Sequence, residues 1–221
     1  MDDFSRKTWI YFLKKKDEVF SWFHSFKALV ENQTRKKIKI LKTNNGTKYE
    51  SNEFKYYCKE AGIKRETTTA YTPEKNGVAE RKNHSIVEAT RAMLHHQSLT
   101  KFLWAEAANT TMYVQNRCLH QALDSKTPKE VFTDKKPYVS HFRIFDSPIY
   151  FHVLKEKRSK LDVSGKEGTF VGYSETSKAY RIYVSGQREV EISHDVTFNE
   201  DAALEKISNL PLPRKDKESD S

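Results

Sequence analysis

Residues 71–83 read YTPEKNGVAERKN, and this stretch joins a strand-like run to a long helical one. Its proline and glycine predict a loop over residues 73–77, because both residue types are typical of turns. Apolar residues then recur at helical spacing, so we expect a helix over residues 78–97. Glu80 falls in the first turn of that helix. A carboxylate there has a purely structural explanation, since anions near helix N-termini gain about 0.3–1 kcal/mol from the helix macrodipole.

Short strand-like runs and helical runs alternate on both sides of this stretch. The strand-like runs are rich in β-branched and aromatic residues, which favour extended structure. Ser51 can cap a helix, and Pro128 suits the first turn of another. The alternation predicts an α/β layer domain over residues 1–135. The expected strands are 8–13, 38–41 and 63–71, and the expected helices are 17–32, 51–61, 78–97, 101–118 and one from Pro128.

The sequence changes character after Pro137. Short β-type runs follow one another, and residues 185–187, Ser-Gly-Gln, form a plausible hairpin turn between two of them. We therefore expect a small all-β domain over residues 138–200. Residues 201–221 combine prolines and mixed charges with few apolar side chains, which predicts a disordered tail. The expected strands are 149–153, 169–173, 180–184 and 189–192.

The composition limits the class of protein. The chain has 221 residues, with 39 Lys and Arg against 30 Asp and Glu, which gives a formal net charge of +9. This excess favours an acidic partner such as nucleic acid, although a solvated basic surface has the same composition. No apolar run approaches the length of about 18–20 residues that a membrane span requires, so we expect no membrane partner. Two cysteines are too few for a disulfide framework or a Cys-rich zinc site.

Residues 71–83 resemble the third catalytic block of copia-type retrotransposon integrases, Tyr-x-Pro-x-x-Asn-Gly-x-x-Glu-Arg-x-Asn, and every fixed position matches. Residues 41–46 are similar to the second block, with Asn44 where the family carries an aspartate. Thirty-five residues separate Asn44 from Glu80, as in the family. Further matches occur in the family's order at residues 2–9, 142–145, 160–162, 170–173 and 195–198.

The resemblance implies a fold and a reaction. It implies a ribonuclease-H-like core in which two aspartates and one glutamate hold two magnesium ions, which promote attack of a DNA 3′-hydroxyl on a phosphodiester. Glu80 is then the third catalytic acid and a metal ligand, and Asn44 occupies the position of the second acid. Because an amide offers magnesium one weak ligand and no charge, Asn44 argues against an intact metal site.

The family's first aspartate lies on a strand upstream of the block at which this sequence begins. We therefore expect residues 1–135 to form a truncated core without that aspartate, the first strand and most of the second strand. A strand edge left unpaired favours association, so we expect a marginal monomer or a sheet completed by another chain. Alternatively, an upstream exon carries the missing part.

The sequence thus predicts an integrase-derived protein that binds DNA and has no catalytic activity of its own. The alternative is a non-catalytic protein that assembles with copies of itself or with other integrase chains. Salt-dependent DNA affinity separates the two, because phosphate contacts make affinity fall steeply with salt. We expect the protein in the nucleus, or in the cytoplasm before import. The residues expected to contact nucleic acid are Lys48, Lys64, Arg65, Lys75, Arg81 and Lys82.

Overall fold

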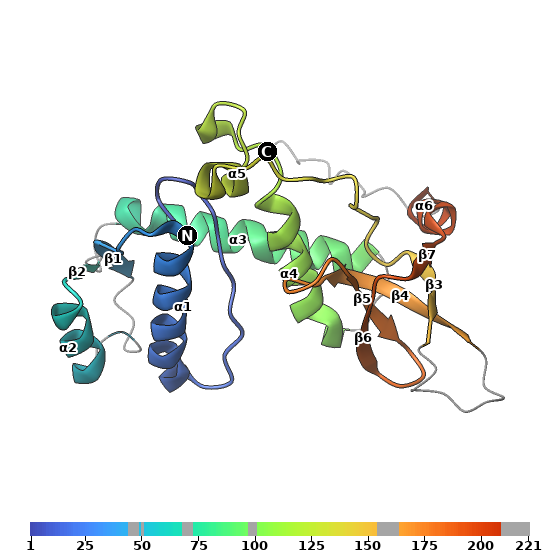
Figure 1. Ribbon diagram of the computed structural model, residues 1–221, viewed down its shortest axis with the longest axis horizontal. Helices are drawn as coiled ribbons and strands as arrows, with labels where there is room; N and C mark the ends of the chain where they lie inside the picture. Colours follow the sequence, from blue (N-terminus) through green and yellow to red (C-terminus); the bar gives the residue numbers. More distant parts are fainter. Residues whose placement is uncertain (44–48, 50, 68–72, 97–100, 154–163, 209–221) are drawn as a thin grey trace, which may run out of the picture. The chain divides into compact units, whose positions relative to one another are not determined.

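Figure 1 shows the computed structural model and labels its helices and strands. It describes part of the chain, and in a few helical turns the backbone alone. The described residues are 1–43, 49, 51–67, 73–96, 101–153 and 164–208, of which 73–76, 95–96, 101 and 206–208 are described without their side chains.

The chain divides into two compact units. The first unit holds Met1–Glu88 and Thr111–Val139, and the second holds Ala89–Thr110 and Ser140–Ser221. The first unit combines helices with a short parallel sheet, and the second contains a five-stranded antiparallel sheet. The predicted fold class, a mixed α/β part followed by an all-β part, is therefore confirmed.

The sheet of the first unit consists of β1 (Ile40–Thr43) and β2 (Lys64–Thr67). The strands are parallel, with Ile40 opposite Lys64 and Thr43 opposite Thr67. Parallel neighbours need a crossover connection, and α2 (Asn52–Glu60) lies in it. Strand β1 overlaps the expected strand 38–41, and β2 lies within the expected strand 63–71.

A cluster of apolar side chains between helices forms the core of the first unit. Phe54 of α2 is fully buried, and Cys58 and Ile63 join it together with Val19 of α1 (Val19–Thr34). The ring of Phe23 lies 5.1 Å from the ring of Phe54, measured between centroids. Burying a ring of this size contributes on the order of 2–3 kcal/mol, so this cluster holds α1 against α2.

Two local signals for helix starts are confirmed. The hydroxyl of Ser51 accepts a hydrogen bond from the backbone N–H of Phe54 at 3.2 Å, at the start of α2. The hydroxyl of Thr127 accepts one from the N–H of Glu130 at 3.1 Å, and Pro128 is the first residue of α5 (Pro128–Thr133). Both caps satisfy N–H groups that a helix start leaves without a partner inside the helix.

The expected strand over residues 8–13 is wrong, because this segment has no strand pairing in the structure. Thr8 instead exchanges hydrogen bonds with the side chain of Asn116, whose amide donates to the Thr8 carbonyl at 2.8 Å. The indole of Trp9 packs edge-on against Phe26 and Phe132 at centroid distances of 5.1 and 5.2 Å. Aromatic packing, rather than hydrogen bonds to a neighbouring strand, holds this segment in place.

The expected loop over residues 73–77 is also wrong. Helix α3 (Pro73–His96) begins at the proline itself, which is a favourable first residue because its missing N–H would have no partner there. Gly77 therefore lies inside the helix. The remaining helical pieces are η1 (Lys16–Glu18), η3 (Lys101–Leu103), α4 (Trp104–Gln115) and η4 (Gln121–Leu123).

The sheet of the second unit has the order β6-β5-β4-β3-β7, with every neighbouring pair antiparallel. The second half of β4 is buried without alternation, and Phe170, Val171 and Ile182 of β5 are fully buried. A register shift between Phe170 and Gly172 marks a β-bulge in the central strand. The strands are β3 (Pro148–His152), β4 (Gly165–Tyr173), β5 (Tyr180–Val184), β6 (Glu189–Ser193) and β7 (Val196–Phe198).

The second unit also contains residues 89–110, which we expected within the core domain of residues 1–135. Ala107 of α4 is fully buried in a cluster with Val171 of the sheet. Arg181 donates two hydrogen bonds to the carboxylate of Glu106, both at 2.6 Å. These contacts make α4 the packing partner of one face of the β sheet.

Helix α6 (Glu200–Ser208) extends over part of the expected tail of residues 201–221. The carboxamide of Asn199 accepts a hydrogen bond from the N–H of Ala202 at 3.3 Å, and Ala203 is fully buried. The cap and the buried side chain explain why a helix forms there. The predicted disorder of residues 201–221 is therefore wrong for residues 201–208, and residues 209–221 lie outside the described residues.

Candidate functional site

Helix α3 presents Glu80, Arg81 and Lys82 in different directions, because successive residues of a helix are about 100° apart. Glu80 and Arg81 are exposed, whereas Lys82 is half-buried. The ammonium of Lys82 donates a hydrogen bond to the side-chain oxygen of Gln115, at the end of α4, at 2.7 Å. Lys82 therefore contributes to packing inside the first unit as well as to its charge.

Two cationic side chains, Arg6 and Lys82, act electrostatically on His120, and we call Arg6, Lys82 and His120 the Lys82 cluster. Burial lowers the pKa of Lys82 below its usual value. Burial also lowers the pKa of His120, and the positive charges of Lys82 and Arg6 lower it further. The Nδ1 atom of His120 accepts a hydrogen bond from the N–H of Ala122 at 3.2 Å, so the neutral ring carries its proton on Nε2. The positive charges of Arg6 and Lys82 at this place favour an anion.

An ion pair joins the N-terminal segment to β1 in the same unit. The ammonium of Lys42 lies 2.7 Å from the carboxylate of Asp3. This hydrogen bond lowers the pKa of Asp3, and the nearby charge of Arg6 acts in the same direction. Nothing in the sequence pattern indicated this pair, because its partners lie 39 residues apart.

The parallel register places Lys64 at the start of the short sheet. Lys64 lies opposite Ile40, whereas Thr43 is at the carboxyl end of β1. Three residues of strand span about 10 Å, so Lys64 lies roughly that far from the carboxyl end of β1. Asn44 and Lys48 themselves lie outside the described residues, as does the side chain of Lys75.

Lys64 and Arg65 also differ in their surroundings. The exposed ammonium of Lys64 lies 2.9 Å from the carboxylate of Glu66. Arg65 is half-buried, donates a hydrogen bond to the carbonyl of Tyr49 at 2.6 Å and lies over the ring of Phe54. Arg65 thus stabilises the fold, and Lys64 remains the more accessible of the two cations.

The described residues do not fit the two-magnesium centre that the resemblance implied. Within them, no group of three His, Cys, Asp or Glu side chains could hold a metal ion. Glu80 is one carboxylate, and position 44 supplies an amide in place of the second. Magnesium prefers carboxylate oxygens, so this donor set is too weak for a pair of ions.

Two family models match the sequence, an integrase core domain over residues 1–73 and a retroviral polymerase SH3-like domain over residues 147–211. The retrovirus-related Pol polyprotein from transposon TNT 1-94 of Nicotiana tabacum is 41% identical over 219 residues, which cover 96% of this chain. The chain belongs to the Pol polyproteins of copia-type retrotransposons.

Two further relatives support this membership. The retrovirus-related Pol polyproteins from transposons RE2 and RE1 of Arabidopsis thaliana are each 32% identical to the integrase-derived chain over 200 residues, or 90% of it. The chain spans 16% of the length of the tobacco polyprotein and 14% of each Arabidopsis one. Among the described residues, no helix is long and apolar enough to span a membrane.

Solved structures resemble the chain only weakly. One is the simian T-cell lymphotropic virus intasome in complex with PP2A regulatory subunit B56 gamma, with a TM-score of 0.44, 17% identity and coverage of 83% of this chain and 63% of that one. Another is the HTLV-2 integrase catalytic core domain in complex with magnesium, in its trimeric form, with a TM-score of 0.41, 21% identity and coverage of 54% and 71%. Neither resemblance assigns a ligand or partner to this chain.

Proposed function

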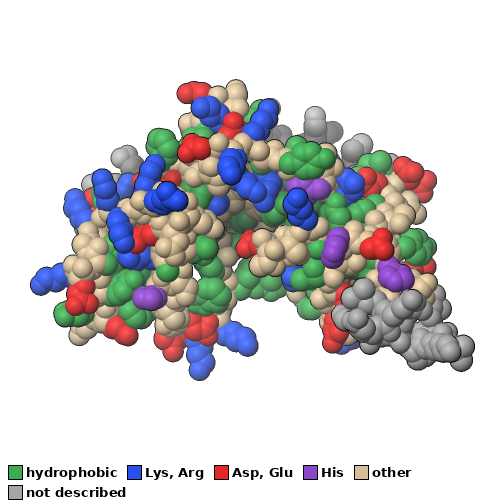
Figure 2. Space-filling model, in the orientation of Figure 1, with side chains coloured by type: hydrophobic (Ala, Val, Ile, Leu, Met, Phe, Trp, Pro, Cys, Tyr) green, Lys and Arg blue, Asp and Glu red, His purple; other side chains and the backbone are tan. Residues whose placement is uncertain are grey.

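We propose that this integrase-derived chain binds DNA through the first unit, at the exposed Arg81 and the neighbouring Lys82 cluster. The observation that carries the proposal is the exposed Arg81 beside Lys82 on α3, together with the positive charges of Lys82 and Arg6 that both act on His120. Figure 2 shows many further Lys and Arg side chains over the part of the first unit that holds α1, β1 and α2. Cations of this density attract the phosphate backbone regardless of base sequence.

DNA affinity measured by fluorescence anisotropy over a range of salt concentrations tests this proposal. We expect a clear decrease in log affinity with log salt, by about 0.9 for each phosphate contacted on a duplex. Arg81→Gln should lower the affinity and the slope, while Lys135→Gln, which removes an exposed lysine outside the Lys82 cluster, serves as a charge-matched control. A flat dependence on salt would contradict the proposal.

We further propose that the chain on its own does not catalyse strand transfer. The support is chemical, since Asn44 supplies an amide where the reaction needs a carboxylate. A magnesium-dependent strand-transfer assay on the purified chain should give no product. Product formation that Glu80→Gln abolishes would show that the chain is an active enzyme. The variant Asn44→Asp asks whether the amide alone is responsible.

A second candidate function is assembly with copies of itself or with other integrase chains. It is favoured by aromatic side chains that α1 and the preceding segment expose, namely Trp22, 41% exposed, and Tyr11, 36% exposed. Their rings lie 5.0 Å apart and form one apolar surface. Sedimentation should then give a mass above that of one chain, and Trp22→Glu should reduce it. DNA affinity insensitive to salt, together with such a mass, favours this candidate.

A role in DNA integration requires access to chromosomal DNA. A nuclear location therefore stays our prediction, and microscopy of the tagged chain tests it.

A further inference from the structure

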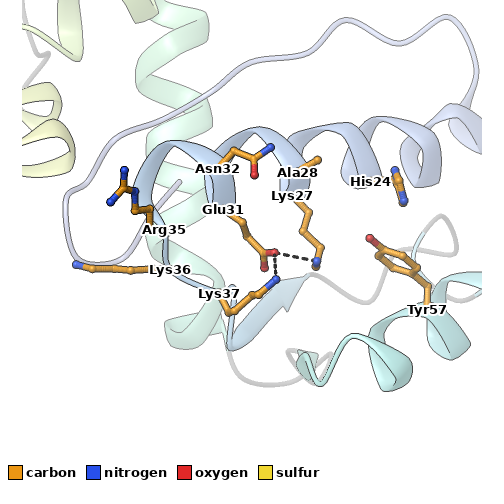
Figure 3. Close-up of a pocket in the computed structure, with 9 residues that line it drawn as sticks. All are labelled: His24, Lys27, Ala28, Glu31, Asn32, Arg35, Lys36, Lys37 and Tyr57. Atoms are coloured by element: carbon orange, nitrogen blue, oxygen red, sulfur yellow. Dashed lines mark hydrogen bonds and ion pairs between the residues drawn. The ribbon is translucent and has the colours of Figure 1, made fainter.

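A pocket of about 340 Å³ lies in the first unit, beside the C-terminal half of α1 (Figure 3). It is lined by side chains from α1, from the segment that links α1 to β1, and from α2. None of its residues is among those that the resemblance singled out for DNA contact. The residues that decide its character are Lys27, Glu31, Arg35, Lys36, Lys37 and Tyr57.

Glu31 fixes two of the lysines in place. One of its oxygens lies 3.0 Å from the ammonium of Lys27 and 3.1 Å from that of Lys37. The other oxygen accepts a hydrogen bond from the backbone N–H of Ile38 at 3.0 Å. Burial opposes ionisation of Glu31, but these three hydrogen bonds prevail and lower its pKa to about 2. The carboxylate is therefore ionised at neutral pH and holds both ammonium groups on one wall.

The pocket keeps an excess of positive charge. Four cationic side chains line it with one carboxylate, which leaves three net positive charges (four minus one) before His24 is counted. Each lysine ammonium has three N–H donors, and Glu31 occupies one on Lys27 and one on Lys37. The remaining donors can bind a ligand or water. An anion is the ligand that this charge selects.

The cations are spread along a rim instead of meeting at one point. Figure 3 shows Lys27 and Lys37 turned toward Glu31, whereas the side chains of Arg35 and Lys36 point away from it. A single free phosphate would use only part of this row. A nucleic-acid strand repeats its charge every 3.4 Å or so along the helix axis, so several of its phosphates can meet the row together.

We propose that this pocket, with its rim of Lys27, Arg35, Lys36 and Lys37, binds successive backbone phosphates of nucleic acid as a second contact surface. It rests on the proposed DNA binding and adds a site to it that Arg81 and the Lys82 cluster do not share. Tyr57 closes one side, with its ring 5.3 Å from that of His24. Its hydroxyl is turned toward α1 in Figure 3, so it can donate a further hydrogen bond to phosphate.

The test compares two double variants of equal charge in the full chain. Lys36→Gln with Lys37→Gln removes two rim cations and leaves the Lys27–Glu31 pair. Lys14→Gln with Lys15→Gln removes two exposed lysines that do not line the pocket. We expect the rim variant to lose affinity for a duplex oligonucleotide about 3- to 10-fold and to reduce the salt slope by about 2, because two phosphate contacts are lost. The control should leave the slope unchanged.

Further arms separate the alternatives. Lys36→Arg with Lys37→Arg retains the charge and should bind like the wild type, and an unchanged thermal unfolding curve of the Gln variant excludes a folding defect as the cause of its loss. If Arg81→Gln weakens binding but the rim variant does not, the pocket inference is wrong and the proposed function survives. If the wild-type chain shows no salt-dependent binding, the proposed function itself fails. If pyrophosphate shifts the NMR signals of Lys36 and Lys37 while the rim variant binds DNA normally, the site takes free phosphate compounds and the assignment to nucleic acid is overturned.

Discussion

The two units bury their sheets to very different degrees. In the second unit, the central strand β4 pairs on both sides, and its Phe170 and Val171 are fully buried. In the first unit, β1 and β2 have four residues each, and Ile40 of β1 is 47% exposed. Parallel strands normally lie inside larger sheets that are covered on both faces. The contrast indicates that helix packing around Phe54, more than the sheet, stabilises the first unit.

The largest expected effect separates the two cores. Phe170→Ala should lower the free energy of unfolding of the second unit by about 3–5 kcal/mol, and Phe54→Ala should do the same in the first, because each removes a fully buried ring. Hydrogen exchange followed by mass spectrometry reports both units separately. Tyr150→Ala, at a 53% exposed position, is the control. Equal loss of protection in both units from either change would contradict the division into two units.

A smaller effect is expected at the bulge of β4. Gly172 has a φ angle of +156°, and a Cβ there would lie 2.6 Å from the hydroxyl oxygen of Thr110 on α4. Gly172→Ala should therefore cost about 1–3 kcal/mol through strain and displacement of that helix. Gly186→Ala, where a Cβ meets nothing within 4 Å, should be close to neutral. Urea unfolding curves measure both, and similar losses would show that the contact with α4 is unimportant.

Removing a helix cap tests how far the first unit depends on local interactions. Ser51→Ala deletes the hydroxyl that accepts the N–H of Phe54, which should destabilise the unit by about 1 kcal/mol. Ser25→Ala removes an exposed hydroxyl inside α1 and should be neutral or slightly stabilising, since alanine is the better helix former. Thermal unfolding followed by circular dichroism compares them. A Ser51→Ala protein as stable as the wild type counts against the cap.

A change confined to acid is expected from Glu31. Its pKa is lowered to about 2 in the folded chain, from an ordinary value of 4.5. The stabilisation is therefore complete above about pH 5 and is lost as the pH falls toward 2. The melting temperature of the first unit should decrease over this window, and less steeply in Glu31→Gln. Identical pH profiles for the two proteins would contradict the role of Glu31.

Signals that act over a few residues could be predicted from the sequence. Ser51 and Pro128 marked helix starts correctly, because a cap and a first turn depend on neighbouring residues alone. The structure of residues 8–13 could not be predicted in this way, since a strand also requires a partner strand. Trp9, one of the aromatic residues that suggested a strand, packs against Phe26 and Phe132 instead. Likewise, the sequence predicted that α4 has apolar residues to bury, but it did not predict that they pack against Val171.

The candidate site follows the same division. The motif identified the family, because the spacing of fixed residues is a property of the chain itself, and the role of Glu80 stays a prediction. It did not reveal that Lys82 bonds Gln115, or that Arg65 is held by Tyr49 and Phe54, since these contacts depend on how the chain folds back. The ion pairs of Glu31 were equally invisible, although the basic run at residues 35–37 was plain.

Arg35 ends α1 in the left-handed conformation, with a φ angle of +55°. Any side chain with a Cβ pays about 1–2 kcal/mol there, and asparagine tolerates it better than most. Arg35→Asn should thus make the protein more heat-resistant while removing one of its rim charges. A single substitution that raises the melting temperature and weakens ligand binding would show that this turn trades thermal stability for recognition.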